Sequence, residues 1–131
     1  MPHPFHAVVY IDHSEAQIFE IAQSDVIEHR IRPVDPQGNI HHKSGSPGSG
    51  HAHEDKNYLT AVAAALQPAH EILIVGHGPA KTALAHFIRD RVPSLATRIV
   101  GVETLDHPTK GEIVAFARKF FETKDHMTPQ R

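Results

Sequence analysis

The amino-acid sequence predicts an α/β protein with a five-stranded mixed sheet, in the order βββαβαβα. Two observations lead to this class. Three short runs rich in β-forming residues occupy the first 32 residues. From residue 55 onward, segments with helical apolar spacing alternate with short continuous apolar runs. A strand-rich first part followed by helix–strand units is typical of a mixed sheet with helices on its faces.

The first part of the chain predicts three strands. Phe5–Ile11 is almost wholly apolar, as expected for a central strand covered on both faces. Ala16–Ala22 follows a turn at Asp12-His13-Ser14. Val26–Arg32 alternates, with one face holding Ile27, His29 and Ile31 and the other Glu28, Arg30 and Arg32. The charged face predicts a strand with one side in water.

The segment Pro33–Glu54 loses this periodicity and contains four Gly, three Pro, three Ser and four His residues. Loops longer than about 12–15 residues are uncommon in compact domains and are usually functional or disordered. We therefore predict a flexible Gly/His-rich loop over 33–54.

The second part predicts three helices and two strands. Helical spacing over Asp55–Leu66 puts five apolar residues on one stripe: Tyr58, Leu59, Val62, Ala63 and Leu66. Glu71–Val75 has the pattern of a buried strand that ends at Gly76. Pro79 suits a first helical position, and the helix to Val92 is expected to bury Leu84, Phe87, Ile88 and Val92 before Pro93 stops it.

Arg98–Glu103 is the fifth predicted strand. Thr109 to Glu112 has the spacing of a capping box, so a last helix is expected from there to about Lys124. This helix is predicted to present Ile113, Ala117 and Phe120 on one face, with Val114 and Phe121 adjoining. The known architecture with this element order is the ribonuclease-H-like topology. We expect a single domain over 1–131 with a frayed tail over 125–131.

Composition narrows the functional classes. A chain of 131 residues is long enough to bury one core. The absence of cysteine excludes disulfides and cysteine-ligated metal sites. The beginning of the chain lacks the pattern of a signal peptide, and no apolar stretch reaches the roughly 20 residues of a membrane span. A cytoplasmic protein with no membrane partner is expected, and the net charge of −2 argues against generic coating of nucleic acid.

The histidines of the loop are candidate metal ligands. His41, His42, His51 and His53 place four imidazoles on one segment, where zinc or nickel could bind. Neighbouring histidines on a Gly/Ser segment have no fixed geometry, and a solvated loop is the plainer interpretation. A metal-binding or protein-interaction module is thus one alternative function, and no cofactor is expected.

Three carboxylates suggest a second alternative. Asp12, Glu103 and Asp106 lie at the ends of the first and fifth predicted strands, where neighbouring strand ends can bring carboxylates together for metal-dependent hydrolysis of a phosphodiester. Asp12 could instead shape a turn, and Asp106 could cap the segment before Pro108.

The stretch Gly76-His77-Gly78-Pro79-Ala80-Lys81-Thr82 follows a strand and opens a helix, so its backbone N–H groups could hold a phosphate. It lacks the spacing of a Walker loop and the third glycine of a dinucleotide fingerprint. We interpret it as a strand–helix turn, with Lys81 as a candidate RNA contact. No nucleophile with an oriented base is found, because the chain has no cysteine and no G-x-S-x-G motif.

Several of these pieces, in this order, resemble one family. The run VVYIDHSEAQIF (8–19), the Gly-rich segment, EDKNYLTAVA (54–63) and ILIVGHGPAKTAL (72–84) are similar to the central domain of eukaryotic and archaeal class I peptide chain release factors and of Pelota. They look closest to the small bacterial relatives called translational machinery proteins. The resemblance covers about residues 7–121.

The resemblance implies a ribonuclease-H-like domain that meets tRNA or ribosomal RNA. In release factors the matching loop carries a catalytic Gly-Gly-Gln tip, whereas residues 43–50 here read KSGSPGSG and contain no Gly-Gly pair. Pelota also lacks the tripeptide. The leading hypothesis is therefore a translation-related domain without peptide-release activity that associates with the ribosome or structured RNA, and an enzyme is not favoured.

The expected RNA contacts come from the loop, with one lysine in support. Histidine can stack on bases and bond phosphates, while glycine lets the backbone approach closely. The third strand and the last helix also leave room for a homo-oligomer. The candidate contact residues are His41, His42, Lys43, Gly45, Gly48, Gly50, His51, His53 and Lys81.

Overall fold

The computed structural model describes residues 5–33 and 56–127, which form one five-stranded mixed sheet with helices on both faces. The strands are β1 (His6–Ile11), β2 (Ala16–Ile21), β3 (Val26–Ile31), β4 (Glu71–Gly76) and β5 (Ile99–Thr104). The helices are α2 (Lys56–Leu66), α3 (Ala80–Arg91), α4 (Pro93–Ala96) and α5 (Lys110–Met127). The α/β class and the five strands are as the sequence predicts.

The strand order is β3-β2-β1-β4-β5. β1 pairs antiparallel with β2 and parallel with β4, while β5 continues the parallel part beside β4. Within the described residues, β3 and β5 are the edges of the sheet. This arrangement is consistent with the predicted ribonuclease-H-like topology. The carboxyl ends of β1, β4 and β5 consequently meet at one end of the sheet, which is called the carboxyl edge below.

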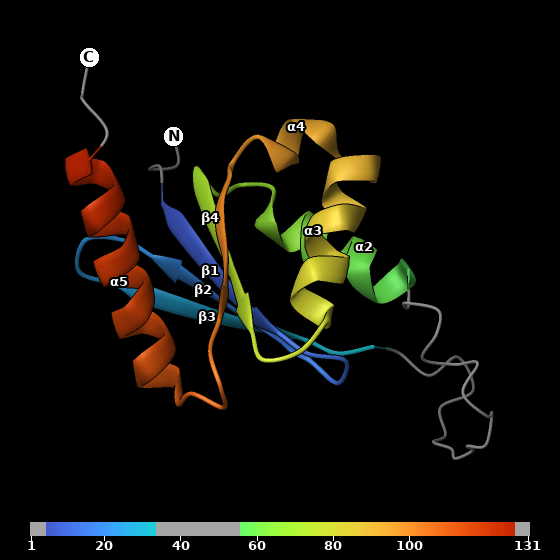
Figure 1. Ribbon diagram of the computed structural model, residues 1–131, viewed down its shortest axis with the longest axis horizontal. Helices are drawn as coiled ribbons and strands as arrows, with labels where there is room; N and C mark the ends of the chain where they lie inside the picture. Colours follow the sequence, from blue (N-terminus) through green and yellow to red (C-terminus); the bar gives the residue numbers. More distant parts are fainter. Residues whose placement is uncertain (1–4, 34–55, 128–131) are drawn as a thin grey trace.

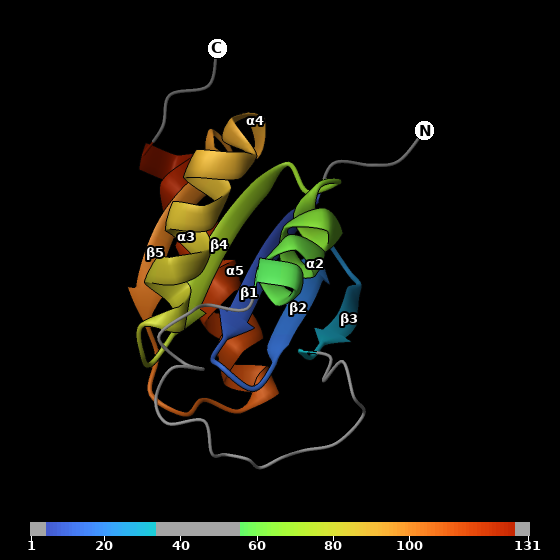
Figure 2. The same cartoon turned by 90° about the vertical axis from the view of Figure 1, so that its right-hand side faces the viewer.

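The two faces of the sheet carry separate apolar cores, and Figures 1 and 2 show α5 on one face with α2, α3 and α4 on the other. β1 contributes to both, because successive strand residues point to opposite faces. Val9 and Ile11 belong to the core beneath α2 and α3, whereas Val8 and Tyr10 belong to the core beneath α5. This double burial explains why β1 lacks polar alternation.

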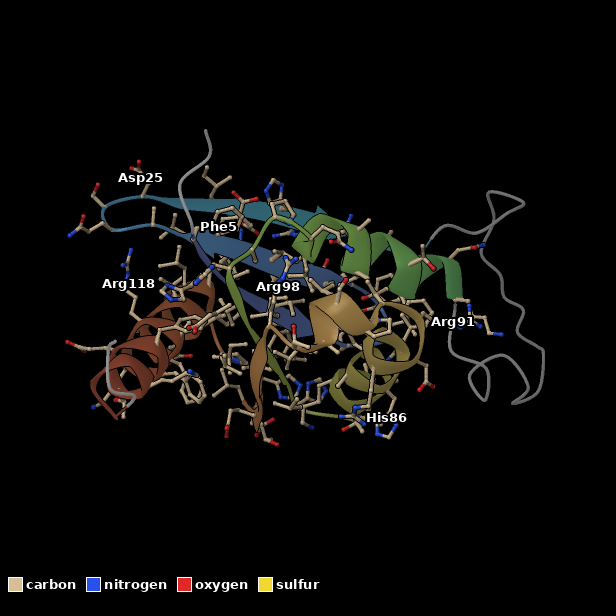
Figure 3. The ribbon with its side chains drawn as sticks, turned by 90° about the horizontal axis from the view of Figure 1, so that it is seen from above. Phe5, Asp25, His86, Arg91, Arg98 and Arg118 are labelled. Atoms are coloured by element: carbon tan, nitrogen blue, oxygen red, sulfur yellow. The ribbon has the colours of Figure 1, made fainter. Side chains whose placement is uncertain are left out.

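Two arginine side chains, Arg98 and Arg118, donate hydrogen bonds to backbone carbonyl groups of other segments. Both are labelled in Figure 3. At the start of β5, Arg98 Nη1 donates to the carbonyl oxygens of Gln67 and Ala69, at 2.6 and 3.1 Å. On α5, Arg118 Nη1 donates to the carbonyl oxygen of Ala22 at 3.4 Å, next to the β2–β3 turn. Polar contacts thus link α5 to the β2–β3 turn and the start of β5 to the α2–β4 connection.

Some helix boundaries differ from the prediction. The sequence predicts Pro93 only as the stop of a helix, but it also opens the four-residue α4, since proline fits the first helical turn. α3 begins at Ala80, with Pro79 as its N-cap residue. α5 continues to Met127, past the predicted end near Lys124, while 128–131 lie outside the described residues. No helix in the described ranges is long and apolar enough to cross a bilayer.

Candidate functional site

The carboxyl edge of β1, β4 and β5 brings together several chemistry-bearing side chains in the described part of the chain. In open α/β sheets, ligands bind beyond the carboxyl ends of parallel strands. Asp12 directly follows β1, His77 directly follows β4, and Asp106 lies two residues after β5. Parallel pairing of β1 with β4 and of β4 with β5 places these three segments on the same edge.

The side-chain rings of Tyr10, His77 and His107 contact one another in a row at this edge. Tyr10 Oη lies 2.7 Å from His77 Nδ1, within hydrogen-bond distance. The His77 ring stacks on the His107 ring, with 4.4 Å between the ring centroids. His107 Nδ1 in turn lies 2.6 Å from Asp106 Oδ1. A hydrogen bond at Nδ1 therefore orients each imidazole, because Tyr10 holds one ring and Asp106 holds the other.

The outer end of this chain of rings faces water. The side chain of His107 is 75% exposed and that of Asp106 is 84% exposed, whereas Tyr10 is buried. His107 also has a positive φ of 53°, which is uncommon outside glycine. Such left-handed backbone at non-glycine residues clusters at ligand sites and switch regions. The exposed imidazole of His107 thus stacks on His77, which is in turn held by the buried phenol of Tyr10.

The Tyr10 phenol stays protonated at physiological pH. Burial raises the pKa of Tyr10, and the negative charges of Asp12 and Asp106 raise it further, while a hydrogen bond with the His107 backbone opposes them. A protonated phenol can donate its hydrogen to an acceptor. Tyr10 can accordingly donate to Nδ1 of a neutral His77, which would leave Nε2–H on the far side of that ring.

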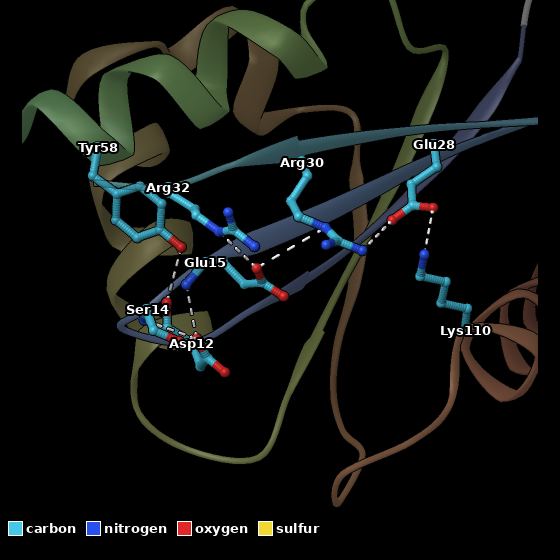
Figure 4. A network of polar contacts seen from close by, with 8 residues as sticks. All are labelled: Asp12, Ser14, Glu15, Glu28, Arg30, Arg32, Tyr58 and Lys110. Atoms are coloured by element: carbon cyan, nitrogen blue, oxygen red, sulfur yellow. Dashed lines mark hydrogen bonds and ion pairs between the residues drawn. The ribbon is translucent and has the colours of Figure 1, made fainter. Parts of the chain in front are cut away.

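Asp12 has the local role of shaping the β1–β2 turn, which Figure 4 shows in detail. Its Oδ1 accepts hydrogen bonds from the Ser14 backbone N–H, the Ser14 hydroxyl and the Glu15 N–H, at 2.8, 2.8 and 2.9 Å. Tyr58 Oη donates to the Asp12 carbonyl oxygen at 2.9 Å and so ties α2 to the same turn. Partial burial opposes ionisation, but the hydrogen bonds from Ser14 and Glu15 to the carboxylate together lower the pKa of Asp12.

Replacing Asp12 with alanine is expected to lower the free energy of unfolding at neutral pH by about 1–2 kcal/mol, after allowance for its partial exposure. Because the folded state has the lower pKa, this contribution is complete above the unfolded-state pKa. It is lost as the pH falls through the folded-state pKa. Urea denaturation of wild type and Asp12→Ala from neutral to acidic pH checks this, with Asp106→Ala as an exposed control. A difference that stays constant into acid would contradict it.

The structure does not join Asp12, Glu103 and Asp106 into a metal-binding group. Across residues 5–33 and 56–127, no three His, Asp or Glu side chains are placed to hold one metal ion. Asp12 is engaged in its turn and Asp106 is directed to His107. Local contacts thus engage two of the three carboxylates, and metal-dependent phosphodiester hydrolysis by this set stays an alternative hypothesis.

Lys81 folds back over the turn between β4 and α3. Its Nζ donates to the Gly78 carbonyl oxygen at 2.9 Å. Since an ammonium group has three donors, the same lysine retains hydrogen-bonding capacity for a ligand. Lys81 as an RNA contact stays a prediction. The eight candidate residues of the loop (His41, His42, Lys43, Gly45, Gly48, Gly50, His51 and His53) lie outside the described residues, as does the predicted histidine metal site.

An apolar groove runs between α2 and α3, near the same end of the sheet. Leu59 of α2 and Ala83 and Phe87 of α3 contribute to its lining, with Lys56 and His86 among its polar members. Figure 3 labels His86 and Arg91, which both lie on α3. The Arg91 guanidinium carbon lies 5.7 Å from the centre of the Phe87 ring, a cation–π contact.

Comparison of the sequence with family models gives no match, and no curated protein matches it either. Solved structures do match. The Thermoplasma acidophilum Pelota protein is 20% identical with a TM-score of 0.63, over 92% of this chain and 34% of that one. Saccharomyces cerevisiae Dom34 is 12% identical with a TM-score of 0.56, over 93% and 36% of the two chains. The archaeal termination factor aRF1 is 8% identical with a TM-score of 0.55, over 94% and 41%.

These matches define the class of fold: an α/β domain shared with translation termination-like factors. The particular likeness is to Pelota, Dom34 and aRF1, which confirms the predicted resemblance to their central domain at the level of the fold. The chain spans between 34% and 41% of the length of these three structures.

Sequence reasoning missed Tyr10 and His107 as site residues and considered His77 only as part of a turn motif. A usable signal exists, because each of the three lies at or just beyond the end of a predicted strand in the parallel part of the sheet. Polar residues that end parallel strands share one edge once the strand order is known.

Proposed function

We propose that this chain is a translation-related domain that binds the ribosome or structured RNA and has no peptide-release activity. One observation carries the proposal: more than 90% of the chain shares a fold with Pelota, Dom34 and aRF1. Dom34 is described as a translation termination-like factor involved in RNA quality control, and aRF1 as a translation termination factor. A cytoplasmic location, where translation takes place, is part of the proposal.

The proposed RNA contacts come from the Gly/His-rich segment between β3 and α2, with Lys81 in support. The glycines allow close approach of the backbone, and the histidines supply rings for stacking and N–H donors for phosphates. The proposed contact residues of this segment are His41, His42, Lys43, Gly45, Gly48, Gly50, His51 and His53.

The stacked rings of His77 and His107 at the carboxyl edge are a second proposed RNA contact. His107 is largely exposed and stacked on His77, so the pair presents flat rings with their orientation already set. RNA-binding proteins use such rings to stack unpaired bases. The exposed carboxylate of Asp106 beside His107 disfavours a phosphate there, so a base is the proposed ligand of the pair.

Peptide release is not part of the proposal because the required tripeptide is missing. Residues 43–50 read KSGSPGSG, without Gly-Gly-Gln. With purified ribosomes carrying peptidyl-tRNA, we expect no release above the level without protein. Release that depends on this chain would contradict the non-enzymatic assignment.

Pelleting with purified ribosomes and a panel of variants tests the contact residues. Replacing residues 41–53 with a short Gly/Ser linker is expected to abolish binding. Lys81→Ala is expected to weaken binding whatever the RNA sequence. It should also reduce the slope of log affinity against log salt concentration by about one. Lys119→Ala on α5 is the matched control for loss of one surface charge. Equal pelleting of the linker variant and the wild type would contradict the assignment of the segment.

A further inference from the structure

β3 is an edge strand with an unusual degree of apolar exposure. It has no fully buried residue, and Val26 and Ile27 are 39% and 54% exposed. The sequence places Ile27 on the apolar face of this strand, but the described structure leaves more than half of it exposed. Edge strands carry unpaired backbone N–H and C=O groups and readily pair with another strand.

The sequence of β3 is complementary to itself in the antiparallel direction. Residues 27–31 read Ile-Glu-His-Arg-Ile, so two copies that cross at His29 place each Glu28 opposite Arg30 of the other copy. Each Ile27 then lies opposite Ile31 of the other copy. Opposite charges and matched apolar residues are favourable cross-strand pairs.

The charged side chains of β3 are already held along one face of the strand, as Figure 4 shows. Arg30 Nη2 lies 3.1 Å from Glu28 Oε2, and Lys110 Nζ of α5 lies 3.0 Å from Glu28 Oε1. The hydrogen bond from Lys110 is the main cause of a lowered pKa of Glu28, and Arg30 also stabilises the charged carboxylate. Less entropy is lost on pairing when side chains are fixed beforehand.

Charged residues on an edge strand often serve to prevent pairing. A blocking pattern places like charges opposite one another when the strand meets its own copy. The pattern of β3 does the reverse, because the self-paired register joins acid to base at both positions 28 and 30. Charge complementarity therefore selects a second copy of this chain as the partner.

We propose that the protein forms a two-fold symmetric dimer through antiparallel pairing of β3 with β3 of a second copy, centred on His29. The two sheets become one continuous sheet across the interface. The contact is isologous, since each copy contributes the same patch. This proposal is independent of the proposed RNA-binding role. The dimer is reversible, so its population rises with protein concentration by mass action.

Charge reversal tests the register by analytical ultracentrifugation over a range of concentrations. Glu28→Arg alone brings two arginines together at each cross-strand pair, and Arg30→Glu alone brings two glutamates together, so each variant is expected to be monomeric. A mixture of the two variants restores opposite charges at both pairs and is expected to form a heterodimer. Circular dichroism confirms that each variant is folded. A wild type that stays monomeric, or single variants that dimerise as well as the wild type, would overturn the proposal.

A cysteine at the two-fold axis gives a second, independent readout, because the natural chain contains no cysteine. Directly opposed residues of antiparallel strands have Cα atoms about 4.5–5.5 Å apart, which suits a disulfide. His29→Cys is therefore expected to form a disulfide-linked dimer under mild oxidation. Glu122→Cys on exposed α5 is the control and should cross-link far less. Equal cross-linking of both variants would contradict the register.

Discussion

Gly76→Ala is expected to lower the free energy of unfolding by about 2–3 kcal/mol, as overpacking against a rigid neighbour does. Gly76 ends β4, and a Cβ built on it lies 2.7 Å from the carbonyl oxygen of Ile11 in β1. Because that neighbour is backbone of a paired strand, it cannot move aside like the tip of a flexible side chain. The added methyl group must therefore separate β1 from β4 at the candidate site.

Gly78→Ala is the matched control, since a Cβ at Gly78 meets nothing within 4 Å. Gly78 lies in the turn only two residues after Gly76, so the pair separates the steric effect from a general effect of alanine. Urea denaturation at neutral pH measures both. Equal loss of stability in the two variants would show that contact with Ile11 does not decide the cost.

Phe121→Ala is expected to lower the free energy of unfolding by about 3–5 kcal/mol, the range for truncating a buried phenylalanine. Phe121 is 4% exposed in the core beneath α5. Its ring stacks on His6 at 4.2 Å and meets Phe120 edge-on at 6.0 Å, between ring centroids. The truncation opens a cavity where α5 contacts the sheet.

Phe116→Ala on the same helix serves for comparison, because Phe116 is only partly buried at the margin of the same core. Its truncation should cost clearly less than that of Phe121. Thermal unfolding followed by circular dichroism measures both variants. A larger loss for Phe116→Ala would mean that α5 is rotated relative to the arrangement described.

The strands are predictable because their patterns are strong. The apolar run of β1 and the alternation of β3 place both strands within one residue of the observed bounds. The five residues expected to be buried on α2 are all buried. Burial of edge strands is less predictable, since alternation assigns Ile27 to a covered face and the edge position leaves it exposed.

The face of α5 shows what the periodicity alone leaves open. The helical spacing predicts Phe120 beside Ile113 and Ala117, but the buried residues are Ile113, Ala117 and Phe121. Phe120 is partly buried over β5, where the missing side chain of Gly101 leaves space for its ring. Phe120 and Phe121 therefore both pack against the sheet, and the position of Phe120 depends on Gly101 of β5. Phe87 of α3 and Val92, which follows it, are also predicted to be buried, but the structure buries them only in part.

The candidate site is predictable only in its parts. The sequence assigns Asp12 and Asp106 to strand ends, and it offers turn roles for both as alternatives. The contact of Tyr10 with His77, and of His77 with His107, joins residues far apart in the chain. These contacts require the strand order β1-β4-β5, which no local pattern specifies.

Co-sedimentation of the wild-type chain with ribosomes on sucrose gradients, at low and moderate salt, tests the central claim most directly. We expect the protein in ribosomal fractions at low salt, with partial loss at moderate salt because phosphate contacts are screened. The variant in which a linker replaces residues 41–53 should stay at the top of the gradient. Wild-type protein that remains at the top under every condition would contradict a ribosome-binding role for this domain.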